Sequence, residues 1–251
     1  MQTRHSKATI ISIAVISMGL AAFLHEGLGH GVTAWLRGDA VTQLTSNHLS
    51  DTEPDRLVEA GGTIVNVFTG VIALWLSSRA RANLRYFLTF FAAVSLLDGA
   101  GYFLYSGIIG VGDWAAVIAG MRHQVALRIF MSIFGACFYY LCVQRIAISL
   151  RPFVADRSEY NIIGRLPYFS ACIFYCIAGA FDPLGIKLLF LSTIPAAFGG
   201  LSGLLWADSL MPKLVPSEPL TVAPSRTWWW TAAIFGVAFV VILGRGINFR
   251  H

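Results

Sequence analysis

Charged residues are scarce in this chain of 251 residues, at 12% against about 25% in an ordinary soluble domain. Apolar residues make up 56% of the chain, with 18 Phe and 7 Trp among the large ones, and the mean hydropathy is +0.67. A soluble fold of this length has too little interior to bury so much apolar surface. The composition therefore excludes a cytosolic enzyme and a disordered chain.

Cysteine is also scarce. The four cysteines all lie within apolar runs, and no C-x-x-C pair is present. This pattern excludes a secreted disulfide scaffold, and small buried hydrophobic side chains explain these cysteines better than a thiolate metal site does. The 18 Lys and Arg are spread among the loops instead of forming a basic stripe, so we expect no nucleic-acid partner.

What the chain does contain is long apolar runs. Seven of them are long enough to approach or exceed the thickness of about 30 Å of hydrocarbon as helices. They cover residues 8–36, 60–77, 86–109, 126–150, 167–181, 184–206 and 228–243, while residues 114–121 are too short to span and are expected to be re-entrant or interfacial. The sequence predicts an all-α fold, a polytopic helical bundle of six to seven transmembrane helices in the lipid bilayer of the cell (inner) membrane.

We expect a single integral membrane domain over residues 1–251. Residues 8–120 form its core, and residues 121–251 add further transmembrane helices. A polar loop at residues 37–59 separates the first two runs and holds five of the chain's 13 acids. Within this loop, residues 41–44 are expected to form a short strand between turn signals.

The first apolar run is expected to be a retained span. A basic head, an apolar stretch and the pair Ala21-Ala22 resemble a signal peptide. However, the apolar pattern continues to Leu36, which favours retention.

The basic residues also orient the chain. With seven spans, the loops on the N-terminal side hold eleven Lys and Arg, and the opposite loops hold seven. Cytoplasmic loops of membrane proteins carry the excess of Lys and Arg, so we expect a cytoplasmic N-terminus.

Two histidines and a glutamate lie close together in the first run, where residues 25–30 read H-E-G-L-G-H. Ionisable residues at membrane depth cost several kcal/mol unless they are paired or ligated, and a divalent metal is the simplest partner for three of them. In the common zinc motif H-E-x-x-H the histidines are four residues apart and share a helix face. His25 and His30 are five apart, which separates them by about 140° on a regular helix.

A π-bulge would restore the shared face, because i→i+5 hydrogen bonding absorbs one inserted residue. Three glycines between residues 27 and 31 make this stretch weak as an α-helix and easy to deform. We therefore expect a π-bulge or local unwinding here, with His25 and His30 as metal ligands. Glu26 would be the general base that acts on a metal-bound water. The alternative is that both histidines face a pore or the lipid headgroups near the end of the span.

The motif at residues 25–31 resembles that of the site-2-protease-like intramembrane zinc metallopeptidases, which usually read H-E-x-G-H. Residues 60–66, A-G-G-T-I-V-N, are similar to the family's A-G-P-x-x-N segment, and residues 96–99, L-L-D-G, resemble its L-D-G motif. The resemblance covers about residues 8–120 and implies Zn²⁺ as cofactor and Asp98 as third metal ligand. The N-P-x-P that often precedes L-D-G is missing. The longer histidine spacing is similar to H-E-L-L-G-H, through which the soluble dipeptidyl peptidase III family coordinates zinc.

Asp98 is also singled out by its surroundings, because a carboxylate in a strongly apolar helix marks a functional site. The alternative for Asp98 is a structural hydrogen bond with Tyr102 or with another helix. Glu59, Asp113 and His48 compete for the third ligand position if the loop folds back. Each of these three is more often a solvated surface residue.

These residues predict an intramembrane zinc metallopeptidase that hydrolyses peptide bonds of a membrane-embedded protein substrate. A helical substrate must unwind or pair as a strand before attack, and the strand at residues 41–44 is expected to offer its edge for this pairing. The alternatives are a catalytically silent relative, a metal-binding membrane scaffold, and a transporter in which the same ionisable residues form an ion path. Internal repeats, which many transporters show, are not visible in the sequence.

Overall fold

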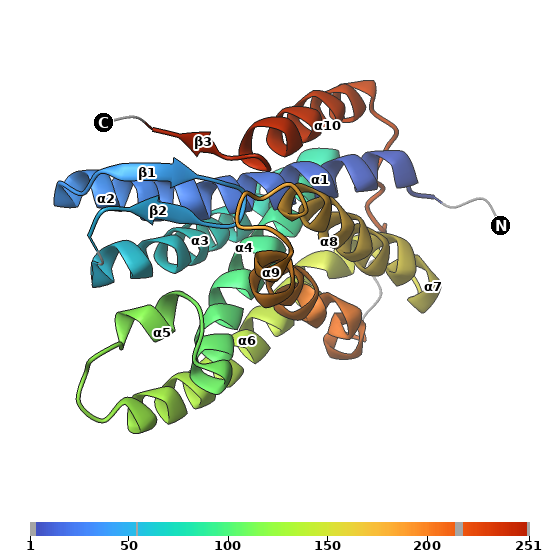
Figure 1. Ribbon diagram of the computed structural model, residues 1–251. Coiled ribbons are helices and arrows are strands. Elements are labelled where there is room, and N and C mark those ends of the chain that lie inside the picture. The colour runs from blue at the N-terminus through green and yellow to red at the C-terminus, as the bar shows by residue number, and fades with distance from the viewer. Residues whose placement is uncertain (1–3, 54, 214–217, 250–251) are drawn as a thin grey trace.

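The computed structural model describes residues 4–53, 55–213 and 218–249. The described chain contains seven helices that are long and apolar enough to cross a membrane (Figure 1). They are Lys7–Arg37, Arg56–Ser77, Ala82–Ile109, Gln124–Phe153, Ser158–Gly179, Ile186–Leu210 and Arg226–Leu243. The expected all-α, multi-pass membrane bundle is confirmed.

Several spans contain 3-10 or π segments, labelled η, beside their α-helical parts. The first four spans and their connections comprise α1 (Lys7–Phe23), η1 (Leu24–Gly31), α2 (Val32–Arg37), α3 (Arg56–Ser77), α4 (Ala82–Ile109), α5 (Asp113–Val117), α6 (Gln124–Leu150) and η2 (Arg151–Phe153). The last three comprise α7 (Arg157–Tyr160), η3 (Asn161–Arg165), α8 (Leu166–Gly179), α9 (Ile186–Leu188), η4 (Leu189–Thr193), η5 (Pro195–Gly199), η6 (Gly200–Leu205), η7 (Ala207–Leu210), α10 (Arg226–Ala238) and η8 (Phe239–Leu243). The strands are β1 (Val41–Leu44), β2 (Leu49–Asp51) and β3 (Ile247–Asn248).

The fifth span begins at Ser158, earlier than the expected residue 167. The added turns are polar: the Asp156 side chain caps their start by accepting from the N–H groups of Ser158 and Glu159, and Arg165 has hydrogen-bond partners. Arg165 donates to Asp208 Oδ2 at 2.9 Å and to Asn161 Oδ1 at 2.6 Å. With its start capped and its arginine paired, the helix extends through a stretch whose hydropathy alone indicates a loop.

A three-stranded antiparallel sheet lies at the end of the bundle opposite the start of α1 (Figure 1). The strand expected at residues 41–44 is confirmed as β1, and the strand order is β2-β1-β3. β1 is therefore paired on both sides, so the expectation that its own edge receives a substrate is wrong. Within the described residues, β2 is an edge strand whose outer side has no strand partner.

The pairing of β1 with β3 joins the segments that follow the first and the seventh span. β1 follows the first span and β3 follows the seventh, and Leu44 pairs with Ile247. The two strands therefore lie on the same side of the bundle, as the six spans between them require. The sheet, α5 and the connection between α8 and α9 all lie on the side opposite the start of α1.

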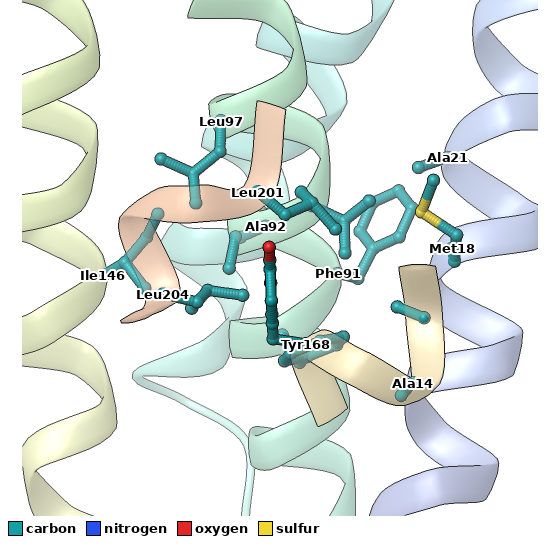
Figure 2. Packing of buried hydrophobic residues seen from close by; sticks show 14 of the residues in the cluster. Ala14, Met18, Ala21, Phe91, Ala92, Leu97, Ile146, Tyr168, Leu201 and Leu204 are labelled. Atoms are coloured by element: carbon teal, nitrogen blue, oxygen red, sulfur yellow. The ribbon is translucent and has the colours of Figure 1, made fainter. Parts of the chain in front are cut away.

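The apolar core is built around α4. Figure 2 shows Phe91 of α4 beside Met18 of α1, with Tyr168 of α8 and Leu201 of η6 close by. The Tyr168 hydroxyl donates to the carbonyl oxygen of Phe198 at 3.0 Å, so its polar end is satisfied in the apolar interior. This core fixes the spans that carry the polar groups described next.

With seven spans, the count of Lys and Arg on the two sides predicts the topology of the chain. A reporter fused after the second span, at Arg79, should be read as cytoplasmic, and one fused after β3 should be read as external, because the N-terminal side carries more Lys and Arg. Protease accessibility of the two fusions measures this. The opposite pattern at both positions would show that the chain is inverted.

Candidate metal centre

The first span changes from α-helix to π-helix at the histidine motif. η1, Leu24–Gly31, continues α1 without a break, and the α-helix resumes at Val32. Hydrogen bonding of the i→i+5 type brings a residue and the fifth one after it toward the same side of the helix. The π-bulge expected from the five-residue spacing is confirmed.

His25 and His30 face each other across this turn. Their Nε2 atoms are 3.1 Å apart, and their rings meet edge to face. Ligand atoms of His25, Glu26 and His30 all lie within 4.8 Å of one another, and the three residues are buried. This group is therefore able to hold a metal ion.

Glycines let the backbones of η1 and α3 touch and leave space for the imidazoles. A Cβ atom on Gly29 would overlap the backbone of Gly62, and one on Gly61 would overlap the carbonyl oxygen of Gly29. A Cβ atom on Gly62 would lie 2.5 Å from Nε2 of both His25 and His30. Small residues allow helices in membranes to approach this closely. At Gly62, the missing side chain also keeps the space beside both nitrogens open.

His30 is oriented by the main chain of α3. Its Nδ1 atom lies 2.7 Å from the carbonyl oxygen of Val58, so Nδ1 carries the proton that is donated. In the neutral ring, Nε2 then has a free lone pair on the side of His25. Metal-ligating histidines are commonly fixed in this way, with the other nitrogen donating to a carbonyl or carboxylate.

Asp98 reaches His25 from α4, but at the other ring nitrogen. Asp98 Oδ2 lies 3.8 Å from His25 Nδ1 and accepts a 2.8 Å hydrogen bond from Asn66 Nδ2. Asn66 Nδ2 also lies 3.2 Å from His25 Nδ1. The structure thus brings His25, Glu26 and His30 together, and it puts Asp98 beside the nitrogen of His25 that does not face His30.

Asp113 lies beside the nitrogens that do face each other. Its Oδ2 atom is 3.2 Å from His25 Nε2 and 3.6 Å from His30 Nε2, and its side chain is 13% exposed. The expectation of a solvated surface residue is therefore wrong, because the chain folds back after α4. Burial alone would raise the pKa of Asp113, but the hydrogen bond and charge of His25 outweigh burial and lower this pKa from its usual value.

The other two competitors, Glu59 and His48, line the cavity beside the site. His48 Nδ1 lies 2.9 Å from Thr45 Oγ1 and 3.3 Å from Asp182 Oδ2, so this ring is held by the loop between β1 and β2 and by the end of α8.

Tyr102 contributes to the site in a way that the sequence did not indicate. Its ring stacks on His25 with centroids 5.0 Å apart. Asp98 and Tyr102 are four residues apart, which puts both side chains on one face of α4. A sequence argument that placed Asp98 beside His25 could therefore also have placed Tyr102 there.

An open cavity of about 700 Å³ adjoins the histidines. Glu26, His30, Asp98 and Asp113 contribute polar groups to its wall, and much of the remaining lining is apolar and comes from α4, η4 and η5. A largely apolar cavity with a few convergent polar groups is the usual form of a ligand or active site.

Comparison with models of known protein families, with curated proteins and with solved structures finds no match for this chain. Two buried imidazoles with facing Nε2 atoms, together with neighbouring carboxylates, form a donor set that suits a divalent metal of intermediate softness.

The open space beside the two nitrogens gives a direct test. Gly62→Ala should abolish stoichiometric metal binding, because the added methyl group would lie 2.5 Å from each Nε2. Metal analysis of the purified protein measures this. Gly70→Ala is the matched control on the same helix as Gly62, since its Cβ atom would lie 2.8 Å from Cγ of Leu96 on α4, away from the histidines. Equal metal content in both variants would contradict the site.

Proposed function

We propose that this chain is an intramembrane zinc metallopeptidase that hydrolyses peptide bonds of membrane-embedded protein substrates, in line with its resemblance to the site-2-protease-like family. One observation carries the proposal. η1 brings His25 and His30 to an Nε2 separation of 3.1 Å and keeps Glu26 in the same buried group. A structural helix has no need of this arrangement at membrane depth, where ionisable groups are costly.

His25 and His30 would hold the metal, and Asp98 and Asp113 flank His25 as candidates for the third ligand. Imidazole and carboxylate ligands with an open position are typical of catalytic zinc sites. When bound, zinc supplies Lewis acidity at a carbonyl oxygen and lowers the pKa of a water molecule to about 7.

Glu26 is the general base in this proposal. It is adjacent to His25 in the chain, it is buried, and its carboxylate lies within 4.8 Å of both imidazoles. It also lines the cavity, so it can take a proton from a water molecule that enters there. Tyr102, stacked on His25, limits the movement of that ring.

The substrate would enter the apolar cavity in an extended form. Leu49 and Asp51 of β2 line the cavity, and β2 is the edge strand of the sheet on that side. An extended peptide can add to such an edge through main-chain hydrogen bonds. This supports β2, rather than β1, as the strand that would align a segment unwound from a membrane helix.

Glu26→Gln tests the mechanism. The assay follows the cleavage of single-span peptides with a helix-breaking Gly or Pro in proteoliposomes, with mass spectrometry as the readout. The cleavage rate should fall by at least about 10²-fold, because the amide cannot act as a base. Zinc content should stay unchanged. Glu53→Gln, at an exposed glutamate of the polar loop, is the control and should cleave normally.

The two readouts separate the alternatives. Normal cleavage by Glu26→Gln would contradict the peptidase mechanism. Loss of zinc from this variant would make Glu26 a ligand and would favour the metal-binding scaffold or the transporter. An unmodified chain that binds zinc but cleaves none of the peptides would favour the catalytically silent relative.

A further inference from the structure

We propose that Asp113, from the segment between α4 and α6, supplies the third metal ligand, and that Asp98 orients His25 from its other ring nitrogen. This inference rests on the proposed metal site and assigns the one position in it that the resemblance gives to Asp98.

The spacing of three atoms carries the assignment. His25 Nε2, His30 Nε2 and Asp113 Oδ2 form a triangle with sides of 3.1, 3.2 and 3.6 Å. Ligand atoms bound tetrahedrally at 2.0–2.1 Å are about 3.3 Å apart. The triangle therefore has the size of one face of a zinc coordination tetrahedron.

Asp98 has the position of a residue that acts through a ligand. Its carboxylate lies 3.8 Å from His25 Nδ1 and accepts a hydrogen bond from Asn66 Nδ2, which itself lies 3.2 Å from the same ring nitrogen. When Nε2 of a histidine binds a metal, Nδ1 carries the proton and points to a partner, often a carboxylate. Of the two groups beside His25 Nδ1, only the Asp98 carboxylate can accept this proton, since the Asn66 amide nitrogen is a donor. Because the two nitrogens of a ring point in different directions, a carboxylate at Nδ1 is poorly placed to share a metal at Nε2.

Several contacts hold the Asp113 segment against the bundle. Thr63 Oγ1 donates to Asp113 Oδ2 at 3.4 Å, and Arg56 Nη2 donates to the carbonyl oxygen of Ala119 at 3.0 Å. The ring of the next residue, Trp114, stacks on Phe103 with centroids 4.3 Å apart. α3 and α4 thus both position the carboxylate.

Two glycines allow the chain to fold back at this point. Gly110 has a φ of 77° and Gly112 a φ of 95°, a backbone region that favours glycine. Gly110 follows the end of α4, and Gly112 directly precedes Asp113. The turn therefore delivers the carboxylate to the histidines, and the segment it begins also lines the cavity with Val111 and Ala116.

Replacing the carboxylate ligand by a cysteine thiolate tests the assignment by absorption spectroscopy. The full-length chain is purified in detergent, loaded with Co²⁺ and compared with Asp113→Cys and Asp98→Cys. A cysteine that binds cobalt adds a sulfur-to-cobalt charge-transfer band in the near ultraviolet. We expect the band in Asp113→Cys, and neither in Asp98→Cys nor in the unmodified chain. A band in Asp98→Cys alone, or in neither variant while cobalt is bound, would overturn the inference.

Zinc affinity is the second measurement, by competition with a chelator, and it does not depend on a folded cysteine variant. Asp113→Asn should weaken zinc binding by more than about 100-fold, whereas Asp98→Asn should stay within the range of about 10–100-fold typical of residues that orient a ligand. An equal or larger loss in Asp98→Asn would overturn the assignment.

His30→Ala separates the inference from the proposed function. If the unmodified chain binds no zinc, or if His30→Ala binds as much as the unmodified chain, the metal site itself is wrong and the inference falls with it. If His30→Ala loses zinc while Asp113→Asn keeps it, only the assignment of Asp113 is wrong.

Discussion

The contact between the backbones of η1 and α3 determines where the polar groups of the centre lie. With no side chain at Gly29, Gly61 or Gly62, the two helices approach so closely that the main chain of α3 reaches the imidazoles. The Val58 carbonyl can then orient His30, and further along α3 the Asn66 side chain contacts His25. Any larger residue in this contact would separate the helices and remove both interactions.

A second polar cluster fixes the sheet above the cavity. Asp182, buried after α8, contacts His48 at 3.3 Å and accepts from Asn47 at 3.5 Å, and Thr193 of η4 donates to Asn47 at 3.1 Å. Burial alone would raise the pKa of Asp182, but hydrogen bonds from His48, the Leu184 backbone and Thr45 outweigh burial and lower this pKa from its usual value. The loop between β1 and β2 is therefore tied to the fifth and sixth spans, which keeps β2 against the cavity.

The features that were predictable from the sequence are the local ones. Run length and composition predict the spans, and the five-residue spacing with its glycines predicts η1, because each depends on neighbouring residues. The early start of the fifth span combines a local cap by Asp156 with the pairing of Arg165 and Asp208, which are 43 residues apart. β3 and the position of Asp113 likewise depend on distant contacts. For Asp113, the sequence offers only a glycine and an acid after the end of an apolar run, a pattern that is equally typical of an exposed turn.

The pairing of β1 with β3 determines when the three-stranded sheet can form during synthesis of the chain. The side chains of Gln43 and Asn248 that hydrogen-bond across these strands are 205 residues apart. At a translation rate of about 5–20 residues per second, roughly 10–40 s pass between the emergence of the two strands. Until then β1 has only β2 as a partner, and an isolated two-stranded hairpin is marginally stable. The three-stranded sheet can therefore form only after the seventh span has entered the membrane, so its formation reports that this span is inserted.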